Sequence, residues 1–195
     1  SIFSFLGIML GVTILIIVMS VMNGFKTELT NKILGLNPHI IIQPNGFDID
    51  EKYISKIKDN FKHISVSKTY SGEGVIINND QVKGIIFKGV NNKEKKIREF
   101  LEKNVVSGDV KKFKKNNVFI GSELAFNLDL NEGDRINLMS SSFVATPLGN
   151  LPKQENFNVA GIFNTGFIEF DQNIIFLTTG DALSIFDKDV KDQNL

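Results

Sequence analysis

The sequence predicts an α+β domain attached to one membrane-spanning helix, and three observations support this prediction. The first 25 of the 195 residues include no charged side chain. After them, short β-branched runs alternate with amphipathic segments, a pattern typical of helices packed on a mixed sheet. The chain as a whole has 22 basic residues, 22 acidic residues and 42% hydrophobic residues, which is the composition of a globular protein.

The apolar run from Ile2 to Phe25 predicts the membrane helix, assigned to residues 1–25. A bilayer-spanning helix needs about 20 apolar residues, whereas the apolar stretch of a signal peptide, the main alternative, has about 7–15. Gly7 and Gly11 lie four residues apart, so two such helices could approach closely. Glycine is also common in membrane helices generally, and the spacing alone does not separate these two interpretations.

The helix is expected to continue past the apolar run as a stalk, residues 26–37. Apolar residues recur at helical spacing from Met22 to Leu36, and polar residues fill the opposite face. Gly35 and the pair Asn37-Pro38 are helix stop signals. A stalk with an apolar stripe needs a surface to pack against, either its own domain or a partner.

Residues 38–195 predict the folded domain. A turn at Asn78-Asn79-Asp80 indicates a hairpin, Asp48 is the expected N-cap of the first domain helix, and Thr178 or Thr179 caps the last. Helices are expected after residue 48 and over residues 93–103, 122–126 and 181–187. Strands are expected over residues 39–43, 64–70, 74–77, 82–90, 118–120, 135–139, 157–163 and 173–177.

The connection between the strands at 135–139 and 157–163 is unusually long, and residues 140–156 are assigned to an arm. It contains apolar residues, and Pro147 and Pro152 are expected to lie outside any sheet ladder because proline lacks a backbone N–H donor. Gly149 permits a tight bend between them. Two interpretations remain open: a stiff protruding arm with an apolar tip, or a loop folded back over the sheet.

The residue types of the chain do not support catalysis. The sequence has no cysteine, which excludes disulfides and thiolate metal sites, and only two histidines. Glu169 and Asp171 could form an acid pair on one strand face, although a solvated face is the simpler interpretation. A lysine cluster at residues 111–115 could contact anionic lipid or nucleic acid, but the zero net charge favours a solvated loop and no nucleic-acid partner.

Four runs of the sequence resemble the LolC/LolE permeases, the membrane subunits of the bacterial lipoprotein-releasing ABC transporter. They are VMSVMNGFKTELTNKILGLNPHI (18–40), GVIINNDQVKGIIFKGV (74–90), IGSELAFNLDLNEGDRINLM (120–139) and FNVAGIFNTGFIEFDQNIIFL (157–177). The segments SVMNGF and TPLGNLP are the most specific of the shared features. The MacB-like permeases are broader relatives.

The resemblance implies a MacB-like periplasmic domain with a mixed α/β lobe and a mostly β lobe that carries a protruding hairpin arm. In LolC-like members this arm, called the hook, binds the periplasmic carrier LolA, and LolE-like members lack it. The TPLGNLP segment matches the hook. The residues that would inherit the carrier contact are Thr146, Pro147, Leu148, Gly149, Asn150, Leu151 and Pro152.

The resemblance also implies a permease subunit without a catalytic site or cofactor, because a separate LolD-like ATPase binds ATP and Mg²⁺. The second permease subunit would be LolE-like or a copy of this chain. The protein would lie in the bacterial inner membrane, with the residues after about 25 in the periplasm. Three further membrane helices of the family are not in this sequence, so we expect the chain to be a fragment.

The substrates implied are lipoproteins, which would leave the membrane by an apolar path. Met19, Met22 and Phe25 are adaptable apolar side chains suited to lining such a path. For each of them, packing against a neighbouring membrane helix is the simpler alternative. Alternatives for the whole chain are a MacB-like efflux permease and a membrane-tethered structural or signalling domain.

Overall fold

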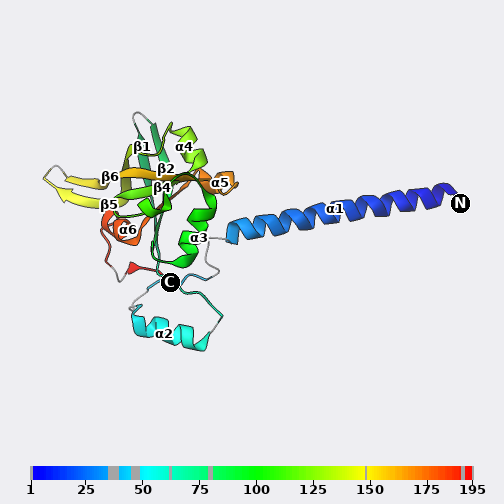
Figure 1. The fold of residues 1–195 in the computed structure, drawn as a ribbon, viewed down its shortest axis with the longest axis horizontal. Helices are drawn as coiled ribbons and strands as arrows, with labels where there is room; N and C mark the ends of the chain where they lie inside the picture. Colours follow the sequence, from blue (N-terminus) through cyan, green and yellow to red (C-terminus); the bar gives the residue numbers. More distant parts are fainter. Residues whose placement is uncertain are drawn as a thin grey trace. The chain divides into compact units, whose positions relative to one another are not determined.

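The computed structural model describes residues 2–34, 40–44, 49–61, 63–78, 81–147, 149–189 and 192–194 (Figure 1). It divides into two compact units, Ser1–Ile40 and Ile41–Leu195. Several predicted features lie outside the described residues. These are the helix stop at Gly35 and Asn37-Pro38, the N-cap at Asp48 and the turn residues Asn79 and Asp80.

The first unit is one continuous helix, α1, Ile2–Leu34. Its 33 residues span about 50 Å at 1.5 Å per residue. The section Ile2–Thr27 is long and apolar enough to cross a membrane, and its side chains are exposed throughout. Thr13 and Thr27 donate their hydroxyl groups to the carbonyls of Met9 and Asn23, at 2.8 and 2.9 Å. These hydroxyls are therefore satisfied within the helix, as a hydrocarbon environment requires.

Seven strands of the second unit form one mixed sheet in the order β3-β6-β4-β7-β2-β1-β5 (Figure 1). A further pairing between β6 and β5 closes six of these strands into a ring, with β3 attached to β6. The β2–β7 and β4–β6 pairs are parallel and the others antiparallel, so the predicted α+β class with a mixed sheet is confirmed. The strands are β1 Tyr70–Asn78, β2 Gln81–Val90, β3 Val105–Gly108, β4 Asn117–Gly121, β5 Arg135–Thr146, β6 Gly149–Phe163 and β7 Ile174–Thr178.

The helices of the second unit are short, and α6 packs against β1, β2 and β7 of this sheet. They are α2 Glu51–Asn60, α3 Lys95–Asn104, the 3-10 turn η1 Val110–Lys112, α4 Ser122–Asn127, α5 Ile168–Asp171 and α6 Thr179–Ile185. The adjacent strands β4 and β7 are almost entirely buried and form the centre of the core. Thr178 caps α6, and its hydroxyl accepts a hydrogen bond from the Asp181 N–H at 3.2 Å.

Three sequence predictions in this unit are wrong. The described residues Ile40–Gln43 form no strand, and of the segment 64–70 only Thr69 and Tyr70 pair, Thr69 through an isolated bridge. A segment with strand propensity forms a strand only where a neighbouring strand can pair with it. Among the described residues, no strand pairs with residues 40–43 or 64–68. The third concerns the cap of helix α2, which is Asp50 and not the expected Asp48. The Asp50 carboxylate accepts a hydrogen bond from the Tyr53 N–H at 2.7 Å.

Three elements, β3, η1 and α5, were not predicted from the sequence. Each is only three or four residues long. Such short elements give too few residues for a periodic pattern to be recognised.

Candidate functional site: the protruding arm

Strands β5 and β6 extend beyond the body of the sheet as a two-stranded hairpin (Figure 1). We call residues 143–152 the arm. The pairing of β1 with β5 ends at Ser140, so in the arm the two strands pair only with each other. Phe143 lies opposite Pro152, and Thr146 lies opposite Gly149 at the tip. Both strands are longer than the sequence predicted, because the segment assigned to a loop continues the ladder.

The turn at the end of the arm is held by local contacts. The hydroxyl of Thr146 donates to the carbonyl of Gly149 at 2.7 Å. Gly149 has a φ angle of +113°, which favours glycine over any residue with a side chain. Pro147 lies in the turn, and Leu148 lies outside the described residues. The tip is thus a tight, locally closed turn.

The apolar side chains of the arm are exposed. The exposed fractions are 62% for Phe143, 42% for Val144 and 50% for Leu151. These side chains do not fold back over the sheet, so of the two interpretations of this segment the structure has the protruding arm. Exposed apolar side chains gathered at the end of a projecting element are typical of a protein contact surface.

The prediction for Pro152 is wrong. This residue was expected outside any ladder, but it lies within β6 and pairs with Phe143. The position tolerates proline because this part of β6 has a neighbouring strand on one side only. Proline on such an edge costs no ladder hydrogen bond when its nitrogen faces outward.

The three residues proposed for an apolar path lie on α1. Met19, Met22 and Phe25 are each 59% exposed and are spaced three residues apart. They belong to the unit Ser1–Ile40, whereas the arm belongs to Ile41–Leu195.

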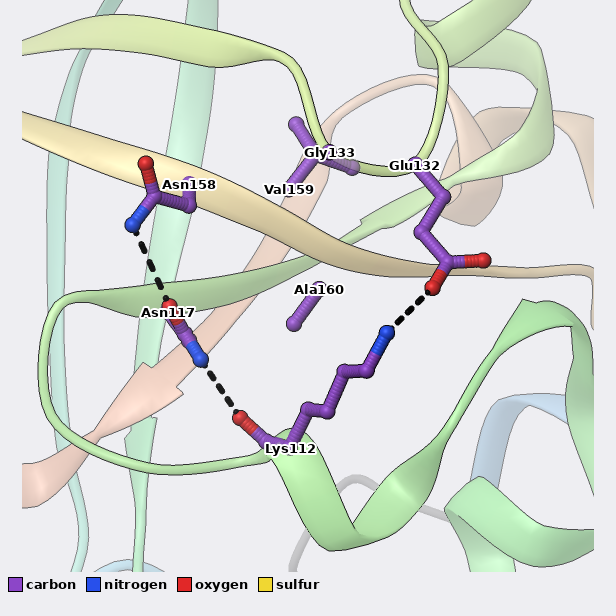
Figure 2. A pocket seen from close by; sticks show the side chains of 7 residues that line it. All are labelled: Lys112, Asn117, Glu132, Gly133, Asn158, Val159 and Ala160. Atoms are coloured by element: carbon purple, nitrogen blue, oxygen red, sulfur yellow. Dashed lines mark hydrogen bonds and ion pairs between the residues drawn. The ribbon is translucent and has the colours of Figure 1, made fainter.

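The second unit also has a shallow depression, lined by residues that include Lys112, Glu132 and Asn158 (Figure 2). Its polar groups bond to one another. The Lys112 ammonium donates to Glu132 at 2.8 Å, the Asn117 amide to the Lys112 carbonyl at 2.8 Å, and the Asn158 amide to the Asn117 amide oxygen at 3.5 Å. The hydrogen bond that Lys112 donates to Glu132 lowers the pKa of Glu132 and raises the pKa of Lys112. This arrangement is a surface ion pair with its neighbours, and it contains no nucleophile paired with a base.

The acid pair considered for Glu169 and Asp171, for which a solvated strand face was the simpler interpretation, does not form on a strand. Glu169 and Asp171 lie on the short helix α5 instead of a strand. Glu169 is exposed, while Asp171 is buried and accepts hydrogen bonds from the Thr165 N–H and hydroxyl at 3.0 and 2.8 Å. Asp171 therefore has a structural role in holding the segment before α5.

Lys88 is a further charged group among the described residues. Burial lowers the pKa of Lys88 on β2, whose ammonium lies 5.4 Å from the centre of the Phe170 ring. Among these residues no three His, Asp or Glu side chains are grouped as a metal site would require. The arm is the feature of this domain best suited to a binding function.

A helix able to cross a membrane, followed by a mixed-sheet domain with a projecting arm, defines the class: a membrane-tethered α+β domain. Sequence comparison gives the family. The chain belongs to the MacB-like periplasmic core domain family, whose model matches residues 1–193.

Curated relatives place the sequence with LolC. It is 28% identical over 192 residues to the lipoprotein-releasing system transmembrane protein LolC of Xylella fastidiosa (strain Temecula1), covering 97% of this chain and 46% of the relative. It is 29% identical over 199 residues to LolC of Neisseria meningitidis serogroup B, covering 96% of this chain and 46% of the relative. The chain thus spans about half the length of these relatives, and the resemblance to LolC-like permeases is confirmed.

The chain also matches a LolE protein, over a shorter stretch, and a solved structure. The LolE protein of Haemophilus influenzae is 32% identical over 149 residues, covering 71% of this chain and 35% of the relative. Among solved structures, the extracellular domain of the noncanonic ABC-type transporter YknZ from Gram-positive bacteria aligns with a TM-score of 0.48 at 11% identity. That alignment covers 77% of this chain and 73% of the YknZ chain.

Proposed function

We propose that this chain is part of a LolC-like permease subunit that hands lipoproteins to a soluble carrier. In this proposal α1 lies in the bacterial inner membrane, and the domain after it lies in the periplasm. The LolC names of the relatives and the apolar section Ile2–Thr27 support this assignment.

The physical task explains the other subunits that we propose. Each CH₂ group of a lipid anchor that leaves the bilayer costs about 0.8 kcal/mol, so extraction needs an external energy source. A LolD-like ATPase would supply it, and a second permease subunit, LolE-like or a copy of this chain, would complete the pathway. Met19, Met22 and Phe25 would line the path with adaptable apolar surface.

The observation that most supports the proposed hand-off is the exposed apolar arm. A stiff hairpin presents its contact residues in one conformation, so little conformational entropy is lost when a partner binds. The carrier contact would be made by residues 146–152, which lie in and beside the turn. A LolA-like carrier, itself a receptor for apolar acyl chains, is the proposed partner.

Retention of the carrier on the immobilised chain tests this proposal. The chain is placed in lipid nanodiscs, and a purified LolA-like carrier from the same organism is applied. Deletion of residues 147–152, or Leu151→Asp, should abolish retention, because a charged side chain cannot be desolvated cheaply against an apolar partner.

A matched control is available at Val82, an apolar residue of β2 that is 64% exposed. Val82→Asp introduces the same charge at a similar exposure away from the arm and should leave retention unchanged. Undiminished retention by the deletion variant would show that the arm is not the carrier site.

The arm also separates this proposal from the main alternative. A MacB-like efflux permease has no need of an apolar arm for a soluble carrier. The lipoprotein-releasing assignment therefore depends on the behaviour of the arm as well as on the names of the relatives.

A further inference from the structure

The base of the arm contains an irregularity in the ladder. Met139 pairs with Gln154, and the next pair beyond it is Phe143 with Pro152. Three residues of β5, 140–142, therefore face the single residue Lys153 of β6. A bulge of this kind re-aims a strand and weakens the ladder locally. The ladder alone does not fix the direction of the arm.

Side chains from both strands at this level bond to the C-terminal end of α6. The Ser140 hydroxyl donates to the Ile185 carbonyl at 2.6 Å, and the Ser142 hydroxyl donates to the Phe186 carbonyl at 2.5 Å. From the opposite strand, the Lys153 ammonium donates to the Ser184 carbonyl at 2.6 Å. Three consecutive carbonyls of one helix end thus receive three donors from the base of the arm.

Helix α6 is a suitable place for these contacts. The last carbonyls of a helix lack intrahelical donors, and the helix dipole favours a positive charge there. Lys153 supplies that charge, and its ammonium also lies 3.6 Å from the Asp187 carboxylate and 4.0 Å from Glu155. The Ser184 hydroxyl donates to the Glu155 carboxylate at 3.0 Å, which adds a second hydrogen bond between α6 and β6.

The end of α6 is itself fixed in the core. Phe186 is buried, and its ring centre lies 5.3 Å from that of Tyr70 and 5.4 Å from that of Phe87. Strand β1 approaches so closely that a Cβ atom on Gly72 would lie 2.4 Å from the Phe186 ring. The base of the arm is therefore bonded to a rigid part of the domain.

We propose that Ser140, Ser142 and Lys153 form a latch that fixes the direction of the arm by binding the last carbonyls of α6. They are positioning residues: they hold the contact surface in place without being required to touch a partner. The effect of the latch on carrier binding rests on the function proposed above, but its effect on the arm does not.

The absence of cysteine from the sequence makes a direct test practical. Spin labels are attached to Ala145→Cys on the arm and Lys103→Cys on α3, both exposed positions, and the distance distribution between them is measured by pulsed electron paramagnetic resonance. The experiment uses the whole chain in lipid nanodiscs. In the Ser142→Ala/Lys153→Met variant the distribution should broaden about twofold, because the bulge is then free to flex.

Two further variants serve as controls. The single variant Lys153→Arg retains a cationic donor, so its distance distribution should be as narrow as that of the spin-labelled chain without substitutions in the latch. Lys188→Met removes an exposed lysine of the same surface and should leave the distribution narrow. An unchanged width in Ser142→Ala/Lys153→Met overturns the latch. If that double variant fails to fold, the single variant Ser142→Ala is measured in its place. An unchanged width in Ser142→Ala then overturns the latch.

Carrier binding is measured on the same samples. If both proposals hold, the double variant loses about tenfold in carrier affinity, the cost of ordering a freed arm. A broadened distribution without carrier binding by the unsubstituted arm supports the latch and contradicts the proposed function. An unchanged distribution contradicts the latch whatever the carrier does.

Discussion

At the scale of single residues, the most demanding positions are those where two backbones touch. A Cβ atom on Gly121 would lie 1.9 Å from the carbonyl oxygen of Asp171. Asp171 is held in place by its hydrogen bonds from Thr165, so α5 cannot easily retreat. Only glycine fits between β4 and α5 without moving one of them.

Gly121→Ala is accordingly expected to lower the free energy of unfolding by about 3 kcal/mol through overpacking. Chemical denaturation followed by circular dichroism measures the change. Gly84→Ala on β2 is the matched control, because a Cβ there meets nothing within 4 Å. A loss of stability as large in the control would show that the close approach at Gly121 is not the cause.

The Lys112–Glu132 pair predicts a pH dependence with a definite sign. Its lysine lowers the pKa of Glu132, so the contribution of the pair is present above the ordinary carboxyl pKa and is lost as the pH falls through the lowered one. The stability difference between the chain and Lys112→Met should therefore shrink on acidification. A carboxyl NMR titration should also place the Glu132 midpoint higher in Lys112→Met, and an unmoved midpoint would contradict the assignment.

At the scale of elements, the sequence predicted those with long, regular patterns. The run predicted as a strand at 82–90 forms β2, the helix predicted at 93–103 forms α3, and Thr178 was among the expected caps of the last helix. Two isoleucine-containing runs, at 39–43 and 64–70, were wrongly predicted as strands, because propensity says nothing about whether a partner strand is near. Pro152 was placed outside the sheet because its edge position was not visible from the sequence.

For the candidate site, too, the sequence did not show which distant residues come into contact. The arm could be predicted from its two prolines and its apolar residues, but its conformation was left open. The contact between Lys153 and the Ser184 carbonyl joins residues 31 positions apart. No local sequence pattern predicts such a contact, because the contact depends on the register of β5 with β6 and on the residue at which α6 ends.

The arm as an element should be less protected than the sheet body. Only two strands pair there, and an isolated two-stranded hairpin has marginal stability. In a hydrogen-exchange measurement, the arm amides, such as those of Val144 and Leu151, should therefore exchange well before those of Ile120 and Ile175 in the core. Equal protection in the two regions would mean that the arm opens only with the whole domain.

At the scale of the whole molecule, the chain combines an apolar helix with a folded domain that carries its own core. The described side chains of the first 27 residues are all exposed, and an apolar helix of this length needs an apolar surrounding. A bilayer provides this surrounding.

Replacing Ile14 and Ile17 by lysine should release the chain from membranes washed with alkaline carbonate. Each charge at the centre of a spanning helix costs about 2.5–3.5 kcal/mol. Ile14→Leu/Ile17→Leu is the control and should stay in the membrane pellet. Retention of the lysine variant would mean that α1 does not span the bilayer.

Site-specific photo-crosslinking in cells tests whether the arm is the surface that meets a lipoprotein carrier. A photoreactive amino acid is placed at Leu151 on the arm and, in a separate strain, at Val106, an equally apolar residue that is 65% exposed on β3. We expect a crosslink to the LolA-like carrier from position 151 and none from position 106. A carrier crosslink from position 106 alone, or none from position 151, would contradict this role of the arm.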